Sequence, residues 1–195
     1  MRLCFATNNL HKLAEVRPLL SSSLELLSLQ DIGCREELPE TQDTLEGNAR
    51  QKAEYVWEHY RVACFADDTG LEVAALYGAP GVYSARYAGP QRSAPDNVQK
   101  LLQELQGAPD RSAAFRTVVA LVGLTPEPQL FAGAVPGLIT EVPRGLDGFG
   151  YDPVFQPNEG DGRTFAEMTL AEKNTLSHRA RAVAGLVSYL QKTAK

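Results

Sequence analysis

Two adjacent aspartates, Asp67 and Asp68, follow the apolar segment 62–66 in the sequence FADDTG. Carboxylates at the end of a strand can hold Mg²⁺, which accepts one or two protein oxygens and takes its remaining ligands from water and substrate phosphate. Because successive strand residues point to opposite faces, the two aspartates are predicted to have different roles. The alternative interpretation is an Asx turn before Thr69 and Gly70.

The acidic connection 30–43 supplies a candidate second metal ligand, Glu40. Its carboxylate offers the hard oxygen that Mg²⁺ prefers. A loop that also carries Glu36 and Glu37 can equally be a solvated acidic loop, and the sequence leaves both interpretations open.

The segment ATNNLHK places Thr7, Asn8 and Asn9 between a short apolar strand and a helix that contains Lys12. The first N–H groups of a helix and its positive dipole end attract phosphate, and a lysine one turn later adds a full charge. The alternative is a helix capped by Thr7 or Asn8, with Lys12 solvated. Neither GxxxxGK[ST] nor GxGxxG occurs, which argues against P-loop NTPases and Rossmann dehydrogenases.

The loop GFGYDP combines backbone freedom at Gly148 and Gly150 with the aromatic faces of Phe149 and Tyr151. An aromatic face in such a loop can stack on a purine, a contact worth about 1–3 kcal/mol per base in nucleic-acid binders. Packing of these aromatics in the core is the alternative.

A cluster of hydrogen-bond donors, Lys173, His178 and Arg179, lies in EKNTLSHRARA, where Ser177 could cap a helix. Such donors suit a phosphate or the oxygen-bearing edge of an oxopurine. The alternative is a solvated basic face.

The elements that must position these residues alternate between helix and strand early in the chain, and strands dominate its middle. We expect strands at 3–6, 24–29, 62–66 and 71–76, and a hairpin of 113–124 with 130–139. We expect four helices: one that follows Asn9 and reaches Leu20, one from Leu45 to about Tyr60, one at 98–105 and one at 180–190. Asp43 with Glu46 and Thr169 with Glu172 have the spacing of capping boxes. The pattern predicts a mixed α/β chain with two lobes around a cleft.

Composition narrows the class of protein. The 195 residues are 44% apolar, and 19 basic against 24 acidic residues give a net charge of −5, which disfavours nucleic-acid binding. Cys4, Cys34 and Cys64 form no CxxC pair, so neither a disulfide framework nor a zinc site is indicated. Without a signal-peptide core or an apolar run of about 20 residues, we expect a cytoplasmic enzyme that does not bind membranes.

Five motifs together resemble the inosine triphosphate pyrophosphatase family, the XTP/dITP diphosphatases. They stand in the order ATNNLHKLAEV, LPETQDTLEGNARQKA, FADDTGLEVAALYGAPGVYSARYAG, DGFGYDPVFQP and FAEMTLAEKNTLSHRARA. The resemblance implies Mg²⁺-dependent hydrolysis of ITP, dITP and XTP to the nucleoside monophosphate and pyrophosphate by a homodimer. It also implies one domain, residues 1–195, in which an elongated mixed β-sheet with flanking helices forms two lobes around a central nucleotide-binding cleft.

Carried over by position, the resemblance implies a role for each candidate residue. Triphosphate binding is implied for Thr7, Asn8, Asn9, Leu10, His11, Lys12 and Lys52, and metal binding for Glu40 and Asp68. Thr69 would lie beside the substrate. The base and sugar would be held by Phe149, Gly150, Tyr151 and Asp152, and the base would also be contacted by Lys173, His178 and Arg179. Asp68 would also accept the proton of the attacking water, a role that Asp67 could share. A nucleotide sensor without hydrolysis and a metal-dependent nucleoside monophosphatase remain the alternative functions.

Overall fold

Helices and strands of the computed structural model are described for residues 1–21 and 24–193. The strands are β1 (Arg2–Phe5), β2 (Glu25–Leu27), β3 (Cys64–Val73), β4 (Pro80–Gly81), β5 (Ser112–Val122), β6 (Gln129–Ile139) and β7 (Phe155–Pro157). The α-helices are α1 (Leu10–Val16), α2 (Leu45–Tyr60), α3 (Ala94–Glu104), α4 (Leu170–Asn174) and α5 (His178–Thr193). Within these described residues, no helix has the length and apolar character needed to cross a membrane.

The strands form a mixed sheet in the order β2-β1-β3-β5-β6-β7, and β4 pairs with β3. Strand β1 runs parallel to β2 and to β3, with Cys4 opposite Cys64. Antiparallel pairs join β3 to β4 and β6 to β7, with Leu138 opposite Gln156. The predicted mixed α/β fold is therefore confirmed, including the neighbouring long strands β5 and β6.

The chain divides into two compact units. Unit 1 comprises Met1–Asp68, Thr117–Gly133 and Arg179–Lys195, and unit 2 comprises Thr69–Arg116 and Ala134–His178. Strands β3, β5 and β6 each contribute residues to both units.

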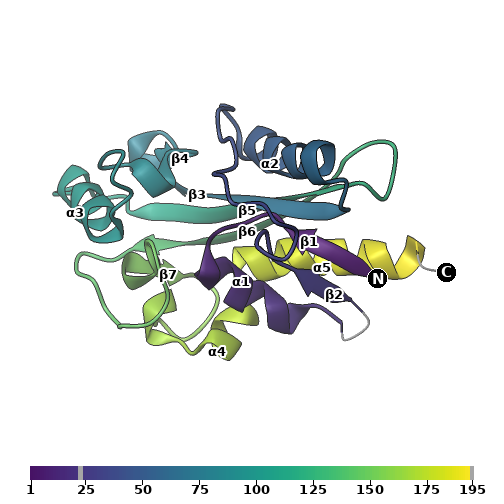
Figure 1. Cartoon of the computed structure of the whole chain (residues 1–195). Helices are drawn as coiled ribbons and strands as arrows, with labels where there is room; N and C mark the ends of the chain where they lie inside the picture. Colours follow the sequence, from purple (N-terminus) through teal and green to yellow (C-terminus); the bar gives the residue numbers. More distant parts are fainter. Residues whose placement is uncertain (22–23, 194–195) are drawn as a thin grey trace. The chain divides into compact units, whose positions relative to one another are not determined.

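In unit 1, the alternation of side chains along β1 and β3 builds a different layer on each face. Phe5 and Phe65 stack with ring centroids 4.6 Å apart and pack with residues of α1 and α5. On the other face, the Cys64 thiol donates to the Ala53 carbonyl of α2 at 3.1 Å. Helices α2 and α5 accordingly lie on opposite faces of the strands (Figure 1). The same alternation places Asp67 on the α1 and α5 face and Asp68 on the α2 face.

Unit 2 has its own apolar core. Phe115 packs edge-on against Phe155 with ring centroids 4.6 Å apart, and α3 buries Val98 and Leu101 against the same cluster. This separate core provides the packing on which the loop around Phe149 is built.

Strand β3 corrects the prediction that a strand ends at Asp67. It continues through the two aspartates to Val73, after which Ala74–Leu76 form a 3₁₀ turn instead of extended backbone. A buried carboxylate in a strand is tolerated only when it is paired, and Asp67 contacts both Lys12 and Arg179. The Asx-turn interpretation is therefore wrong.

Helix α1 is shorter than predicted, and two of the predicted caps are misplaced. It ends at Val16 and passes into the 3₁₀ turn Arg17–Leu19, because Pro18 has no N–H to continue the α-helical ladder. Its cap is Asn9, not Thr7 or Asn8. The cap of α2 is Thr44, whose hydroxyl accepts from Gly47 N at 3.0 Å, and not Asp43. The capping box of Thr169 with Glu172 is confirmed.

Candidate functional site

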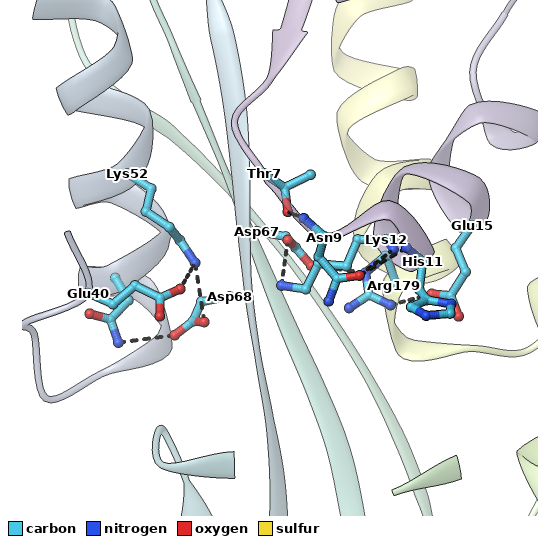
Figure 2. Close-up of polar contacts among 11 residues, drawn as sticks. Thr7, Asn9, His11, Lys12, Glu15, Glu40, Lys52, Asp67, Asp68 and Arg179 are labelled. Carbon is cyan, nitrogen blue, oxygen red and sulfur yellow. Dashed lines mark hydrogen bonds and ion pairs between the residues drawn. The ribbon is translucent and has the colours of Figure 1, made fainter. Parts of the chain in front are cut away.

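Asp67 lies at the centre of a buried ionic cluster in unit 1. Lys12 Nζ contacts its Oδ1 at 2.8 Å and Arg179 Nε contacts its Oδ2 at 2.9 Å. Arg179 also donates through Nη1 to the buried Glu15. Figure 2 shows these residues converging from β3, α1 and the start of α5. We call Glu15, Lys12, Asp67 and Arg179 the Asp67 cluster.

The charges of the Asp67 cluster balance, with two carboxylates facing two cations. Burial acts to raise the pKa of Asp67, but Lys12 and Arg179 hold it well below its usual range. Burial lowers the pKa of Lys12, whereas Asp67 and Glu15 outweigh burial and raise the pKa of Arg179. Asp67 is therefore ionised at neutral pH and its charge is neutralised by Lys12 and Arg179, which makes it a weak proton acceptor.

Asp68 belongs to a second group of side chains, on the α2 face. Lys52 Nζ contacts Glu40 Oε1 at 2.6 Å and Asp68 Oδ1 at 3.4 Å, and Asn48 Nδ2 donates to Asp68 Oδ2 at 3.1 Å. Asn48 and Lys52 lie on one face of α2 because they are four residues apart. We call Glu40, Asn48, Lys52 and Asp68 the Asp68 cluster; its charged members appear in Figure 2 on the opposite side of β3 from Asp67.

The Asp68 cluster has a different charge balance, since two carboxylates face one ammonium. Burial raises the pKa of Asp68, against the effect of Lys52. Burial acts to lower the pKa of Lys52, but Asp68 and Glu40 raise it overall. With these three groups ionised, the cluster carries one excess negative charge.

The donor set of the Asp68 cluster fits Mg²⁺. Glu40 and Asp68 converge on a single cation, Lys52, and Mg²⁺ is commonly held by one or two carboxylates completed by water and substrate phosphate. In the part of the chain that the structure describes, no group of three or more His, Cys, Asp or Glu side chains could hold a metal. A metal held by Glu40 and Asp68 would therefore have two protein carboxylates and would take its remaining ligands from water and substrate.

The N-terminal segment is locally ordered by its own side chains. Thr7 Oγ1 accepts from Asn9 N at 3.1 Å, and Asn9 Oδ1 accepts from the N–H groups of His11 and Lys12 at 2.9 and 3.2 Å. Asn8, Leu10 and His11 are exposed. The N–H groups of His11 and Lys12 are therefore satisfied by Asn9, and the positive charge near this segment is that of Lys12, which is paired with Asp67.

In unit 2, Asp152 organises the glycine-rich loop. Its Oδ2 accepts from Phe149 N at 2.8 Å and from Lys173 Nζ at 2.5 Å. Lys173 Nζ also lies 5.1 Å from the Phe149 ring centroid. Gly148 has φ +77°, and a Cβ there would collide with Asp152 Oδ2. The loop conformation thus requires glycine at 148 and a carboxylate at 152.

Tyr151 and His178 are held in the interior of unit 2. The Tyr151 hydroxyl donates to Ser84 O at 2.9 Å, and burial raises the pKa of Tyr151. The His178 ring stacks on Phe115 with centroids 4.6 Å apart. Tyr151 is consequently an anchor of the loop, whereas Phe149 and Gly150 line a hollow of about 880 Å³ in unit 2.

The structure thus brings Lys12 together with Arg179 in unit 1, Glu40 with Lys52 and Asp68, and, in unit 2, Phe149 with Asp152 and Lys173. Thr69 is half-buried on β3, next to Asp68. Whether these groups bind one ligand stays a prediction.

Sequence reasoning missed two buried polar residues, Glu15 and Asn48. Both are at most 3% exposed and contact a predicted site residue. A signal existed for Asn48, because Asn48, Lys52 and Val56 recur at four-residue spacing on the apolar face of α2. Glu15 likewise stands beside Val16 on the buried side of α1.

Comparisons with known proteins cover nearly the whole chain. The Ham1 family model matches residues 3–189. A protein of Porphyromonas gingivalis named dITP/XTP pyrophosphatase is 54% identical over 97% of this chain and 97% of its own length, and one of Flavobacterium johnsoniae with the same name is 52% identical over 99% and 100%.

Solved structures that match this chain include proteins with the same family or activity names. The Staphylococcus aureus Ham1 protein is 34% identical with a TM-score of 0.89, covering 99% of this chain and 100% of that one. A Mycobacterium abscessus protein described as nucleoside-triphosphatase / dITP/XTP pyrophosphatase is 44% identical with a TM-score of 0.77, covering 96% and 99%.

Proposed function

Since this chain belongs to the Ham1 family, we propose that it is a nucleoside triphosphate pyrophosphatase acting on non-canonical purine nucleotides. The family relationship confirms the resemblance predicted from the five motifs. The proposed substrates are ITP, dITP and XTP, the proposed products are the nucleoside monophosphate and pyrophosphate, and the proposed role is removal of damaged precursors from the nucleotide pool.

The observation that carries this proposal is the unequal charge of the two aspartate clusters. Two cations neutralise Asp67, whereas Asp68 shares one ammonium with Glu40. We assign Mg²⁺ to Glu40 and Asp68. When bound there, the ion would supply positive charge that stabilises departing pyrophosphate.

The proposed reaction is attack of water on the α-phosphorus. The water oxygen forms a bond to that phosphorus, the bond from the α-phosphorus to the oxygen bridging to the β-phosphorus breaks, and Asp68 takes the proton of the water. Lys12 and Lys52 hold the negative oxygens of the triphosphate. Asp68 suits this role because, unlike Asp67, it is not enclosed by two cations.

The proposed base selectivity depends on donors in unit 2 and at the start of α5. Hypoxanthine and xanthine present an oxygen at position 6, which a donor such as His178 can satisfy, whereas adenine presents an amino group there. A donor facing a donor leaves buried groups unpaired, which disfavours ATP strongly. We propose that Phe149 stacks on the base and that Asp152 and Lys173 fix the loop that presents it.

The test is a panel of ITP, dITP, XTP, GTP, ATP and IMP with and without Mg²⁺, scored separately for pyrophosphate and orthophosphate. We expect pyrophosphate from ITP, dITP and XTP only with the metal, and far less from ATP. Orthophosphate from IMP would favour a monophosphatase, and tight ITP binding without any product would favour a sensor. Equal kcat/KM for ITP and ATP would contradict the proposed selectivity.

A homodimer in the cytoplasm is part of the same proposal. Light scattering of the purified chain at micromolar concentration is expected to give twice the monomer mass of 21.2 kDa. A monomer at all concentrations that support activity would remove the dimer from the proposal and leave the reaction unaffected.

A further inference from the structure

Asn48 is a buried amide that contacts Asp68 and the loop that carries Glu40. It is 1% exposed, its Oδ1 accepts from Gln42 N at 2.9 Å, and its Nδ2 donates to Asp68 Oδ2 at 3.1 Å. Because a backbone N–H can only donate, the oxygen of the amide must face Gln42 and its NH₂ group must face Asp68. The orientation of the side chain is therefore fixed by its two partners.

Gln42 belongs to the loop that carries Glu40, so Asn48 joins that loop to strand β3. The loop packs closely on α2, since a Cβ at Gly47 would lie 2.7 Å from Gln42 Cβ. Gln51 holds the same loop independently, accepting from Thr41 N at 3.0 Å and donating to Thr41 Oγ1 at 2.8 Å. Gln51 thus anchors the loop through Thr41, whereas Asn48 anchors it and also holds Asp68.

The neutral charge of Asn48 distinguishes its role from that of the groups around Asp67. Lys12 and Arg179 hold Asp67 in place and cancel its charge. An amide donor can hold a carboxylate oxygen with similar geometry and leave its charge in place. Asp68 Oδ2 is thereby oriented by Asn48, while Oδ1 faces Lys52 at 3.4 Å, a long contact.

We propose that Asn48 is a positioning residue for the reaction, which sets the orientation of Asp68 relative to Glu40 without neutralising either carboxylate. This inference rests on the proposed function. It assigns Asn48 no contact with the nucleotide, so its loss should affect turnover much more than substrate binding. Loss of partners that orient reactive or metal-binding side chains typically costs about 10- to 100-fold in activity.

The test compares Asn48→Ala, Asn48→Leu and Gln51→Ala with the wild-type chain. Asn48→Leu has a similar branched shape and no charge, but gives no donor to Asp68 and no acceptor to Gln42 N, so it removes both contacts without leaving a cavity or placing a like charge against Asp68. Gln51→Ala is the matched control that weakens the loop anchor without touching Asp68. Pyrophosphate release from ITP gives kcat and KM, thermal unfolding reports folding, and calorimetry in EDTA measures ITP binding without turnover.

We expect both Asn48 variants to lose about 10- to 100-fold in kcat, with KM and metal-free ITP affinity within about threefold of wild type. Gln51→Ala is expected to keep kcat within about threefold while its unfolding temperature falls. If Asn48→Ala does not fold, Asn48→Leu decides alone.

Wild-type kcat in folded Asn48→Leu overturns the inference, as does an equal kcat loss in Gln51→Ala or a tenfold loss of metal-free ITP affinity in either Asn48 variant. A wild-type chain that releases no pyrophosphate from ITP overturns the proposed function as well. An active wild type with unaffected Asn48 variants overturns only the role of Asn48.

Discussion

The Asp67 and Asp68 clusters occupy opposite faces of one strand and handle charge differently. Asp67 is enclosed by Lys12 and Arg179, and the latter also binds Glu15, so the cluster is neutral. Asp68 shares Lys52 with Glu40 and is oriented by the neutral Asn48. Two adjacent residues of the same type therefore differ in their surroundings: one joins β3 to α1 and α5, and the other keeps a negative charge to which we assign the proposed cation.

The largest effect is expected at Asp68. Asp68→Asn removes the proposed proton acceptor and should lower kcat for pyrophosphate release from ITP by about 10²- to 10⁴-fold. Calorimetric ITP binding in EDTA should change little, because the amide keeps the shape of the side chain. A variant with near-normal kcat would exclude Asp68 as the base.

Asp67→Asn is expected to lower the free energy of unfolding more than Asp68→Asn does. The substitution leaves Lys12 and Arg179 without their shared countercharge, and breaking a buried ion pair costs about 3–5 kcal/mol. Urea unfolding of this variant next to Asp68→Asn measures the difference. Equal free energies of unfolding for the two variants would contradict the separation of roles.

The contribution of Asp67 to stability should also appear in the acid dependence of unfolding of the wild-type chain. The pKa of Asp67 lies lower in the folded protein than the ordinary value of about 3.9 in the unfolded chain. Its contribution to the free energy of unfolding is therefore complete above about pH 4 and is lost as the pH falls toward the folded pKa. Urea midpoints from pH 6 to pH 2 should fall less steeply in Asp67→Asn than in wild type.

Glu15→Gln is expected to have a smaller effect, because Arg179 keeps its contact with Asp67. The glutamine still accepts a hydrogen bond, so we expect a loss of about 1–3 kcal/mol in the free energy of unfolding, measured in urea. A double-mutant cycle with Asp67→Asn should show coupling between the two positions. Strict additivity would mean that the four charges do not act as one cluster.

Lys52→Gln is expected to shift the pH dependence of ITP hydrolysis. Lys52 lowers the pKa of Asp68 against the raising effect of burial, so its removal should raise that pKa further. Because the base must be deprotonated, the acidic limb of the kcat/KM profile for ITP should move to higher pH, whatever the loss in absolute rate. An unmoved or lowered limb would assign that limb to another group.

The sequence predicted the opposite orientations of Asp67 and Asp68, because side-chain alternation in a strand is a local property. It did not predict that the strand continues past Asp67, since that depends on pairing with Arg179, 112 positions later. Glu15 was missed for the same reason, as its partner Arg179 is 164 positions away. Local competition among polar residues also decided the caps, which is why Asn9 and Thr44 replaced the predicted ones.

The loop GFGYDP of unit 2 was also predicted only in part from the sequence. The glycines of GFGYDP correctly indicated a tight backbone, and Gly148 does adopt a positive φ. Nothing in the local pattern separated Phe149, which lines a hollow, from Tyr151, whose hydroxyl binds Ser84 in the interior. That difference arises from packing against a turn that lies 67 residues earlier in the chain.

The central claim is that the Asp68 cluster, and not the Asp67 cluster, binds the divalent cation. The most direct measurement is electron paramagnetic resonance of Mn²⁺ in place of Mg²⁺, with an ITP analogue carrying a methylene group between the α- and β-phosphorus so that it cannot be cleaved there. We predict protein-bound Mn²⁺ in the wild type and in Glu15→Gln, and loss of at least tenfold in its affinity in Asp68→Asn. Unchanged Mn²⁺ affinity in folded Asp68→Asn would contradict the account.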